Sequence, residues 1–247
     1  MKIFIDSADL DEIRKYMSWG ICDGVTTNPT ICLKCGIEGG TEGIKQRTLE
    51  IADLIYPRPV SVEVTSDIIS EVVAQGKEYA TWAENIAVKV TITDRYGESM
   101  LPAIYRLVTD GVQVNVTAMM TTSQAILAAK CMESAGATKE RPNFISIFAG
   151  RIADEHGVEQ AAKVLRQTRE WLDLFDYSSE IIVGSIRRPE NVNSYAALGA
   201  HILTIPPDVL AKSLSAARTR ETVTQFLTDA EKALAACREM ELAQVAK

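Results

Sequence analysis

The chain has 247 residues, 47% of them hydrophobic, with a net charge of −7 at pH 7 and an isoelectric point near 5.1. This acidic balance and the lack of a basic stripe argue against a nucleic-acid partner, and no apolar run approaches the roughly 18 residues of a membrane span. The first residues, MKIFIDSADLDEI, are too acidic and too briefly apolar for a secretory signal. We therefore expect a cytoplasmic protein.

Short β-branched segments alternate with helical patterns along the whole chain. Strands are predicted at residues 2–7, 24–28, 60–65, 86–93, 112–118, 143–150, 181–186 and 201–206. Helical periodicity follows each strand, for example at 10–19, 67–82, 122–135 and 158–175. This alternation predicts right-handed βαβ units and a parallel sheet. Eight such units favour a closed (β/α)8 barrel, for which about 250 residues are typical. An open sheet is the alternative, but residues 7–9 lack a glycine-rich dinucleotide loop.

A further helix is predicted at residues 219–240, beyond the eight units, from apolar residues at helical spacing. We therefore predict one barrel domain over residues 1–247 with this helix at its C-terminal end. The helix packs either on the outer wall of the barrel or on a neighbouring subunit, and the sequence leaves both open. We expect a homo-oligomer of undetermined size.

The cysteines do not form a disulfide framework, because five of them occur at irregular spacing. Cys32 and Cys35 form a C-x-x-C pair, which is half of a zinc site or a redox motif. A second pair of ligands is missing, and His156 and His201 lie far away in the sequence. We expect ordinary reduced thiols, no metal and no cofactor, and leave open whether the pair has any role.

Lys89 is the most informative residue of the chain. It lies in the middle of 86–93, whose nearly continuous β-branched and apolar character predicts a strand covered on both faces. Lysine is rarely buried without a partner, because removing an ammonium ion from water is costly. Burial favours the neutral amine, which can attack a carbonyl carbon. The competing interpretation is a structural ion pair or a lysine on the surface.

Polar residues lie at or near the carboxyl end of almost every predicted strand, where barrel enzymes carry their chemistry. They are Asp6, Thr27, Asn28, Glu63, Thr65, Lys89, Thr91, Asn115, Thr117, Arg151, Ser185, Arg187 and Thr204. Glu63 and Lys89 belong to adjacent predicted strands. If both side chains point inward, a carboxylate and an amine meet near the barrel axis. That pair suits an amine nucleophile with general acid–base catalysis.

Basic residues cluster after the sixth and seventh predicted strands. Arg151 follows the sixth, and Ser185, Arg187 and Arg188 follow the seventh. Barrel enzymes often bind phosphate in this region, and a hydroxyl with guanidinium groups suits an anion. For Arg188 taken alone, a surface salt bridge is the preferred interpretation.

Several motifs resemble those of the transaldolase family, in its short single-barrel branch that also includes fructose-6-phosphate aldolase. They are FIDSA at 4–8, GVTTNP at 24–29, SVEV at 61–64, VKV at 88–90, NVTA at 115–118, FAGRI at 148–152 and SIR at 185–187. The resemblance covers essentially the whole chain in order. It implies a cofactor-free enzyme that acts on a small phosphorylated or sulfonated sugar.

The resemblance also implies a role for individual residues. Lys89 matches the lysine that forms the Schiff base, and Asp6 matches the carboxylate that assists cleavage of the carbon–carbon bond. Glu63 matches an acid–base group that works through a water, with Thr117 as the other holder of that water. The implied substrate-binding residues are Asn28, Thr27, Asn115, Phe148, Arg151, Ser185, Arg187 and Arg188.

Two positions distinguish the branches of the family. The aldolase has Gln in place of Glu63 and Tyr in place of Phe148, so this chain looks like a transaldolase. The alternatives are an aldolase that releases free dihydroxyacetone and a non-catalytic barrel that binds sugar phosphates. The segment SIFAGR at 146–151 and the additional Arg188 depart from the usual pattern. They leave open whether the anionic tail of the sugar substrate is a phosphate or a sulfonate. The acceptor aldehyde and the pathway also stay open.

Overall fold

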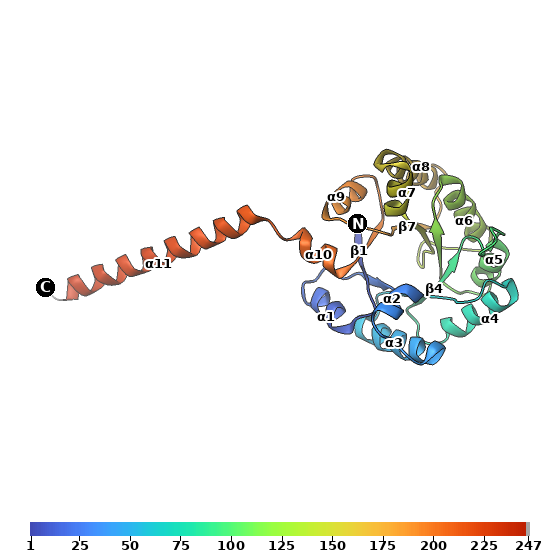
Figure 1. Ribbon diagram of the computed structural model, residues 1–247, viewed down its shortest axis with the longest axis horizontal. Coiled ribbons are helices and arrows are strands. Elements are labelled where there is room, and N and C mark those ends of the chain that lie inside the picture. Colours follow the sequence, from blue (N-terminus) through green and yellow to red (C-terminus); the bar gives the residue numbers. More distant parts are fainter. Residues whose placement is uncertain (246–247) are drawn as a thin grey trace. The chain divides into compact units, whose positions relative to one another are not determined.

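Eight parallel strands close into a barrel in the order β1 to β8, each paired with its neighbours along the chain (Figure 1). The computed structural model describes residues 1–245. The strands are β1 (Lys2–Asp6), β2 (Gly24–Thr26), β3 (Val60–Glu63), β4 (Ile86–Thr91), β5 (Val114–Met119), β6 (Phe144–Ile147), β7 (Glu180–Val183) and β8 (Ile202–Ile205). The predicted (β/α)8 fold is therefore confirmed.

Helices connect the strands and surround the barrel (Figure 1). They are α1 (Leu10–Ser18), α2 (Pro29–Lys34), α3 (Gly40–Ile55), α4 (Ile69–Ala80), α5 (Leu101–Thr109), α6 (Thr122–Ser134), α7 (Ala149–His156), α8 (Val158–Leu174) and α9 (Pro189–Ala196). Two more helices, α10 (Pro207–Ser213) and α11 (Ala217–Val245), follow the last strand. Side chains cap the first turns of α1, α2 and α6. The Asp9 carboxylate accepts from two backbone N–H groups at the start of α1, and Thr121 and Gln124 form a capping box on α6.

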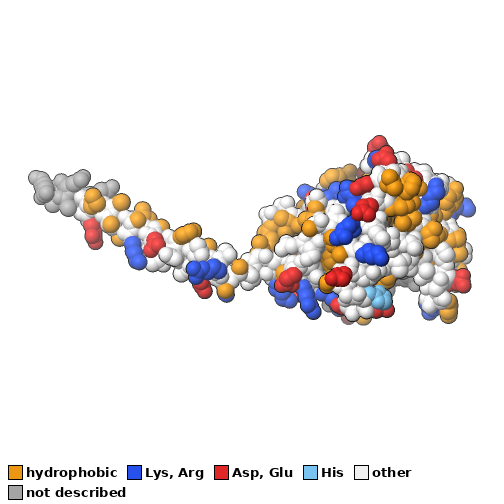
Figure 2. All heavy atoms as spheres, turned by 90° about the horizontal axis from the view of Figure 1, so that it is seen from above, with side chains coloured by type: hydrophobic (Ala, Val, Ile, Leu, Met, Phe, Trp, Pro, Cys, Tyr) orange, Lys and Arg blue, Asp and Glu red, His pale blue; other side chains and the backbone are white. Residues whose placement is uncertain are grey.

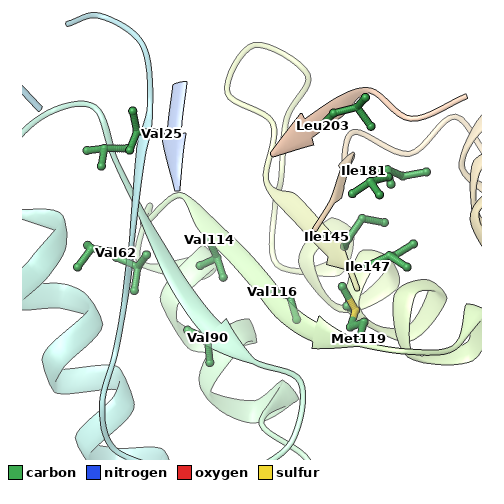
Figure 3. Packing of buried hydrophobic residues seen from close by; sticks show 14 of the residues in the cluster. Val25, Val62, Val90, Val114, Val116, Met119, Ile145, Ile147, Ile181 and Leu203 are labelled. Carbon is green, nitrogen blue, oxygen red and sulfur yellow. The ribbon is translucent and has the colours of Figure 1, made fainter. Parts of the chain in front are cut away.

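The outer faces of the strands are apolar and pack against the helices in one continuous core (Figure 3). On β4, for example, Ile86, Val88 and Val90 belong to this core, while Ala87 and Lys89 alternate with them and point into the barrel. All five residues are buried, as the sequence predicted for this strand. Each fully buried valine or isoleucine contributes about 1.5–3 kcal/mol to folding.

The barrel interior is filled by a separate apolar layer at the end where the strands begin. This layer is formed by Phe4, Ala87, Phe144, Ile182 and Ile202. The rings of Phe4 and Phe144 meet edge to face, with 6.0 Å between their centroids. A Cβ atom on Gly24 would lie 2.6 Å from the Phe4 ring, so only glycine fits beside it. The apolar layer fills the interior at this end, and the polar side chains lie above it towards the carboxyl ends of the strands.

The chain divides into two compact units, one of residues 1–210 and one that begins at Ala211. The second unit contains α11, which covers and extends the helix predicted at 219–240. Several large apolar side chains on α11 are exposed, among them Val223, Phe226 and Leu227. Figure 2 shows hydrophobic side chains between charged ones along this helix. The prediction that residues 1–247 behave as a single domain stays a prediction.

Within residues 1–245, no helix combines the length and the apolar character needed to cross a membrane. The same residues hold no group of three or more His, Cys, Asp or Glu side chains arranged to bind a metal ion. The five cysteines are free; Cys32 is buried in α2, and Cys35 is half-buried at the end of that helix.

Candidate active site

A cavity of about 500 Å³ opens at the carboxyl ends of the strands. Most of the predicted site residues line it: Asp6, Asn28, Glu63, Lys89, Thr117, Phe148, Arg151, Ser185 and Arg187. They come from seven strands or from the loops and helices that directly follow them. Thr27, Asn115 and Arg188, which were also predicted as binding residues, are not among the lining residues.

Lys89 reaches the floor of this cavity from β4. Its Nζ donates to the backbone carbonyl of Thr27 at 2.9 Å and lies 3.5 Å from Oε2 of Glu63. The side chain of Lys89 is only 5% exposed, and that of Glu63 is 18% exposed. The two residues share one register position on β3 and β4, so both side chains point inward. The amine and the carboxylate therefore meet, as their alternation along the strands predicted.

Asp6 lies at the end of β1 and faces the same cavity. The Thr26 hydroxyl donates to Oδ1 of Asp6 at 2.6 Å and also contacts the Thr204 hydroxyl. Burial raises the pKa of the Asp6 carboxyl above its ordinary value, although the nearby charges of Lys89 and Lys34 and the Thr26 hydrogen bond pull it back. A carboxylate in this state is a stronger proton acceptor than one in water.

A hydrogen-bonded polar layer supports the cavity from below. Asn115 donates from Nδ2 to the Ser61 hydroxyl at 3.0 Å, and its Oδ1 accepts from the Ser146 hydroxyl at 2.7 Å. The Thr27 hydroxyl donates to the carbonyl of Ser61 at 2.9 Å. Asn115 and Thr27 therefore hold the cavity floor in place, and the Thr27 carbonyl positions the lysine amine.

Thr117 differs from these neighbours because its buried hydroxyl has no hydrogen-bond partner among the residues described. The residue lies on β5 and lines the cavity. The next residue, Ala118, has a φ of 62°, a left-handed conformation that is uncommon for a residue with a side chain. Such backbone strain is frequent at functional sites. An unpaired buried hydroxyl beside an open cavity is suited to hold a water or a substrate oxygen.

The side of the cavity formed by residues that follow β6 and β7 is cationic. The Arg151 guanidinium lies over the Phe148 ring, 5.2 Å from its centroid, which is a favourable cation–π distance. Ser185 has a φ of 60° in the loop after β7. A Cβ atom on Gly150 would lie 1.8 Å from the carbonyl oxygen of Ser185, so this close approach requires glycine. The fit between the start of α7 and the loop brings Arg151 and Ser185 to the same cavity.

Arg187 lies on the border between this cavity and a second one. The second cavity measures about 250 Å³ and is also lined by Arg188, Asp154 and Tyr195. Arg187 forms an ion pair with Asp154 on α7. Arg188 lines only the second cavity, so it is separated from the lysine by its neighbour Arg187.

Several further lining residues were not assigned to the site from the sequence, among them Thr26, Lys34, Ser146 and Thr204. Thr26, Ser146 and Thr204 were missed as functional groups because single hydroxyls in strands are common, although Thr204 had been noted as polar at a strand end. Lys34 was missed because it belongs to α2, a helix of six residues too short for a periodic pattern. The Asn-Pro pair at 28–29 is the signal for this helix, since the Asn28 side chain caps it and proline is favoured at its first position.

Known proteins are similar in sequence to this chain over nearly its whole length. Residues 3–246 match the family described as Transaldolase/Fructose-6-phosphate aldolase. A "Probable transaldolase" of Streptococcus agalactiae is 38% identical over 229 residues, 93% of this chain and 97% of that protein. Proteins with the same description are 37% identical in Lactiplantibacillus plantarum, over 93% of this chain and 96% of the relative, and 35% identical in Aquifex aeolicus, over 94% and 97%.

A solved structure of different sequence shares the fold. The thiamine phosphate pyrophosphorylase of Pyrococcus furiosus superposes with a TM-score of 0.54 at 11% sequence identity, over 83% of this chain and 85% of that one. At this identity the likeness concerns the barrel fold alone.

Proposed function

The chain belongs to the transaldolase/fructose-6-phosphate aldolase family, and from that premise we propose that it is a transaldolase that works through a Schiff base on Lys89. It would move a dihydroxyacetone unit from an anionic ketose to an aldehyde acceptor. The single observation that carries the proposal is the position of the Lys89 amine. It is buried at the floor of an open cavity, beside the Glu63 carboxylate and opposite the Asp6 carboxylate.

The first half of the reaction forms the covalent intermediate. The neutral Nζ of Lys89 adds to the C2 carbonyl carbon of the ketose, and the carbonyl oxygen leaves as water when the imine forms. Glu63 supplies and removes the protons for this dehydration. The unpaired Thr117 hydroxyl supports a water-mediated route, because it lines the cavity and offers a second point of attachment for the water.

Cleavage then depends on a base at the C4 hydroxyl. Asp6 accepts this proton, the C3–C4 bond breaks, and its electron pair moves to C3 to give an enamine on Lys89. The raised pKa of Asp6 supports this role because it strengthens the carboxylate as a base. The Thr26 hydroxyl occupies only Oδ1 of Asp6, so Oδ2 is free to face the substrate.

Transfer requires that the enamine survives until an acceptor aldehyde arrives. Phe148 lines the cavity without a hydroxyl, so it cannot protonate the enamine carbon. The acceptor carbonyl carbon is then attacked by C3, the new hydroxyl receives the proton from Asp6, and water hydrolyses the imine. The lack of a hydroxyl on Phe148 is the observation that favours transfer over release of free dihydroxyacetone.

The proposed substrate tail is a phosphate or a sulfonate. Arg151, Ser185 and Arg187 line the side of the cavity where a guanidinium pair and a hydroxyl can share one anion. Both tails present three acceptor oxygens in similar geometry. We propose small anionic sugars, rather than nucleic acid or membrane, as the binding partners of this site.

We also propose a cytoplasmic homo-oligomer. The exposed apolar side chains of α11, including Phe226 and Leu227, support self-association because such groups are usually covered in the working state of a protein. The five free cysteines are consistent with a reducing compartment. Light scattering on the purified chain would give the oligomer size, and a monomer at working concentrations would contradict the first part of this proposal.

Borohydride trapping tests the catalytic proposal directly. The chain is incubated with fructose 6-phosphate, or with 6-deoxy-6-sulfofructose, in the absence of an acceptor and is then reduced. Mass spectrometry should find a three-carbon adduct on the peptide that contains Lys89. Addition of an aldose phosphate before reduction should discharge the adduct. An adduct on another lysine, or no adduct with either ketose, would refute the proposal.

A further inference from the structure

Arg187 is paired with a carboxylate. Its Nη1 forms an ion pair with Oδ2 of Asp154, which lies on α7 one turn after the start of that helix. Both side chains are about half exposed, 53% for Arg187 and 55% for Asp154. Arg187 lines both the active-site cavity and the second cavity, whereas Asp154 lines only the second. The ion pair thus joins the proposed anion site to the smaller cavity beside it.

The second cavity contains a polar group that lacks a partner. Tyr195, on α9, is 3% exposed and lines this cavity. Its buried hydroxyl has no hydrogen-bond partner among residues 1–245. Burial raises the pKa of Tyr195, and the charge of Asp154 raises it further, so this carboxylate lies within electrostatic range of the phenol. A buried hydroxyl without a partner is costly, and a nearby carboxylate that can reach it would remove that cost.

We propose that Asp154 sets the affinity for an anionic tail by an exchange of partners: it holds Arg187 in the free enzyme and passes to the Tyr195 hydroxyl when an anionic tail takes Arg187. No bond forms or breaks covalently in this exchange. Arg187 turns towards the active-site cavity, and the Asp154 carboxylate turns into the second cavity and accepts from the Tyr195 hydroxyl. This inference rests on the proposed anionic substrate.

The strengths of the contacts favour the exchange. Ion pairs between exposed side chains contribute little, because water screens them and both side chains lose freedom. A hydrogen bond from a guanidinium to a bound phosphate or sulfonate is stronger, and the Tyr195 hydroxyl gains its missing partner in the same step. An uncharged ketose offers nothing that can displace Asp154. The carboxylate therefore competes with a charged tail for Arg187 and leaves the binding of an uncharged ketose unchanged.

A double-mutant cycle on the full-length chain tests the inference. The variants are Asp154→Ala, Tyr195→Phe and both together, and calorimetry gives the dissociation constants of fructose 6-phosphate and fructose. Asp154→Ala should tighten binding of fructose 6-phosphate by up to about fivefold, because Arg187 no longer has to leave a partner. Tyr195→Phe should weaken it by roughly 2- to 10-fold, because the displaced carboxylate loses the hydroxyl that would donate to it.

The double variant distinguishes an exchange of partners from two independent effects of the substitutions. In the Asp154→Ala background, Tyr195→Phe should no longer change the affinity for fructose 6-phosphate. Fructose should bind equally to all four proteins. Asp173→Ala is the matched control, since Asp173 forms a similar exposed pair with Arg169 on α8, outside both cavities; it should leave both affinities unchanged.

Three results would overturn the inference. Weaker binding of fructose 6-phosphate to Asp154→Ala would show that the carboxylate merely orients Arg187, and additive effects of the two substitutions would show that Asp154 and Tyr195 do not communicate. Equal affinity of the unmodified chain for fructose and fructose 6-phosphate would overturn it as well. Borohydride trapping with dihydroxyacetone, which has no anionic tail, reports on Lys89 separately, so a failure of the proposed catalysis is distinguishable from a failure of the exchange.

Discussion

Lys89 and Glu63 are directly paired across the β3–β4 ladder, which places Nζ and Oε2 3.5 Å apart. Because side chains alternate between the two faces of a strand, a shift of one residue in this register would send one of them into the outer apolar core. The Val62 and Val88 side chains, which flank the pair on the outer face, fix the register by their burial. The proposed chemistry therefore depends on packing outside the barrel as much as on the cavity within it.

Removal of the amine should abolish covalent catalysis. We expect Lys89→Met, which keeps much of the side-chain volume, to lose the borohydride-dependent adduct and to lower turnover by at least about 10³-fold. Mass spectrometry and a coupled transfer assay measure the two effects. Lys34→Met serves as the control, because Lys34 lines the same cavity but should not prevent the adduct on Lys89. Normal turnover by Lys89→Met would rule out the mechanism.

Neutralising Glu63 should slow the proton transfers without removing the nucleophile. Glu63→Gln is nearly isosteric and is expected to reduce transfer by roughly 10²–10⁴-fold, the usual range for the loss of a general acid or base. The adduct should still form on Lys89 after long incubation. Rapid-quench measurement of imine formation would locate the slow step. If imine formation keeps its rate while transfer falls, Glu63 acts only after the first half of the reaction.

A hydroxyl at position 148 should favour release over transfer. Phe148→Tyr would place a phenol beside the Lys89 intermediate, and a phenol can protonate the enamine carbon. We expect a several-fold higher ratio of free dihydroxyacetone to transferred product, measured with a fixed amount of acceptor. Phe175→Tyr, at an exposed position just beyond α8, is the control for general effects of the substitution. An unchanged product ratio would mean that another group controls the fate of the enamine.

The order and type of the barrel elements could be predicted because each element has its own local signal. On β4 the alternation of Val88, Lys89 and Val90 corresponds to one outer and one inner face. Element ends were less well predicted. The sixth strand was expected to continue through 150, but it ends at Ile147; Phe148 is the N-cap of α7, which begins at Ala149. The reason is tertiary: Gly150 must pass close to Ser185, and that contact bends the chain into a helix earlier than local propensity indicates.

The candidate site was predictable where a residue with reactive chemistry lies at the end of a predicted strand. It was not predictable where tertiary packing decides which side chain faces the cavity. Buried ionisable residues at strand ends, such as Asp6 and Lys89, are rare enough to be recognised in a sequence. Arg188 could not be separated from Arg187, because which of two adjacent arginines faces the cavity depends on the conformation of Ser185 two residues earlier. Asp154 and Tyr195 line one cavity from α7 and α9, two helices that no local pattern connects.

The Asp6 carboxyl should destabilise the protein at neutral pH. Its pKa is raised by burial in the folded state, so the native protein binds this proton more tightly than the unfolded chain does. The stabilising contribution of the protonated group is full below the unfolded value of about 4 and is lost as the pH rises through the raised pKa. Asp6→Asn should therefore melt at a higher temperature than the parent at pH 7 while losing at least about 10²-fold in turnover.

Thermal unfolding as a function of pH tests whether ionisation of Asp6 destabilises the folded protein. The stability difference between Asp6→Asn and the parent should shrink as the pH falls through the raised pKa of Asp6, and it should be smallest below about 4, where both side chains are neutral in the folded and unfolded states. The Thr26 hydroxyl can donate to the amide oxygen in the variant, as it does to Oδ1 of the acid, so the contact is kept. A difference that is constant with pH would indicate a packing effect rather than the ionisation of Asp6.

The cationic side of the cavity should discriminate by tail charge. A charge-assisted hydrogen bond to a phosphate or sulfonate contributes about 1.5–3 kcal/mol, so Arg151→Ala or Arg187→Ala should lower kcat/KM for fructose 6-phosphate by roughly 10- to 150-fold. The loss for Arg187 should lie nearer the lower limit, because its side chain is half exposed and already engaged by Asp154. Free fructose should lose little with either variant.

Arg188 supplies the internal comparison for these measurements. It lines only the second cavity, so Arg188→Ala should change little for any ketose if that side chain makes only surface contacts. A change in the ratio of kcat/KM for 6-deoxy-6-sulfofructose and fructose 6-phosphate would instead show that Arg188 helps to choose the anion. For Arg151 and Arg187, one result would contradict a role in binding the tail. Equal losses on charged and uncharged ketoses would mean that these two residues support the fold or the chemistry, because a group that contacts only the tail cannot slow a substrate that has none.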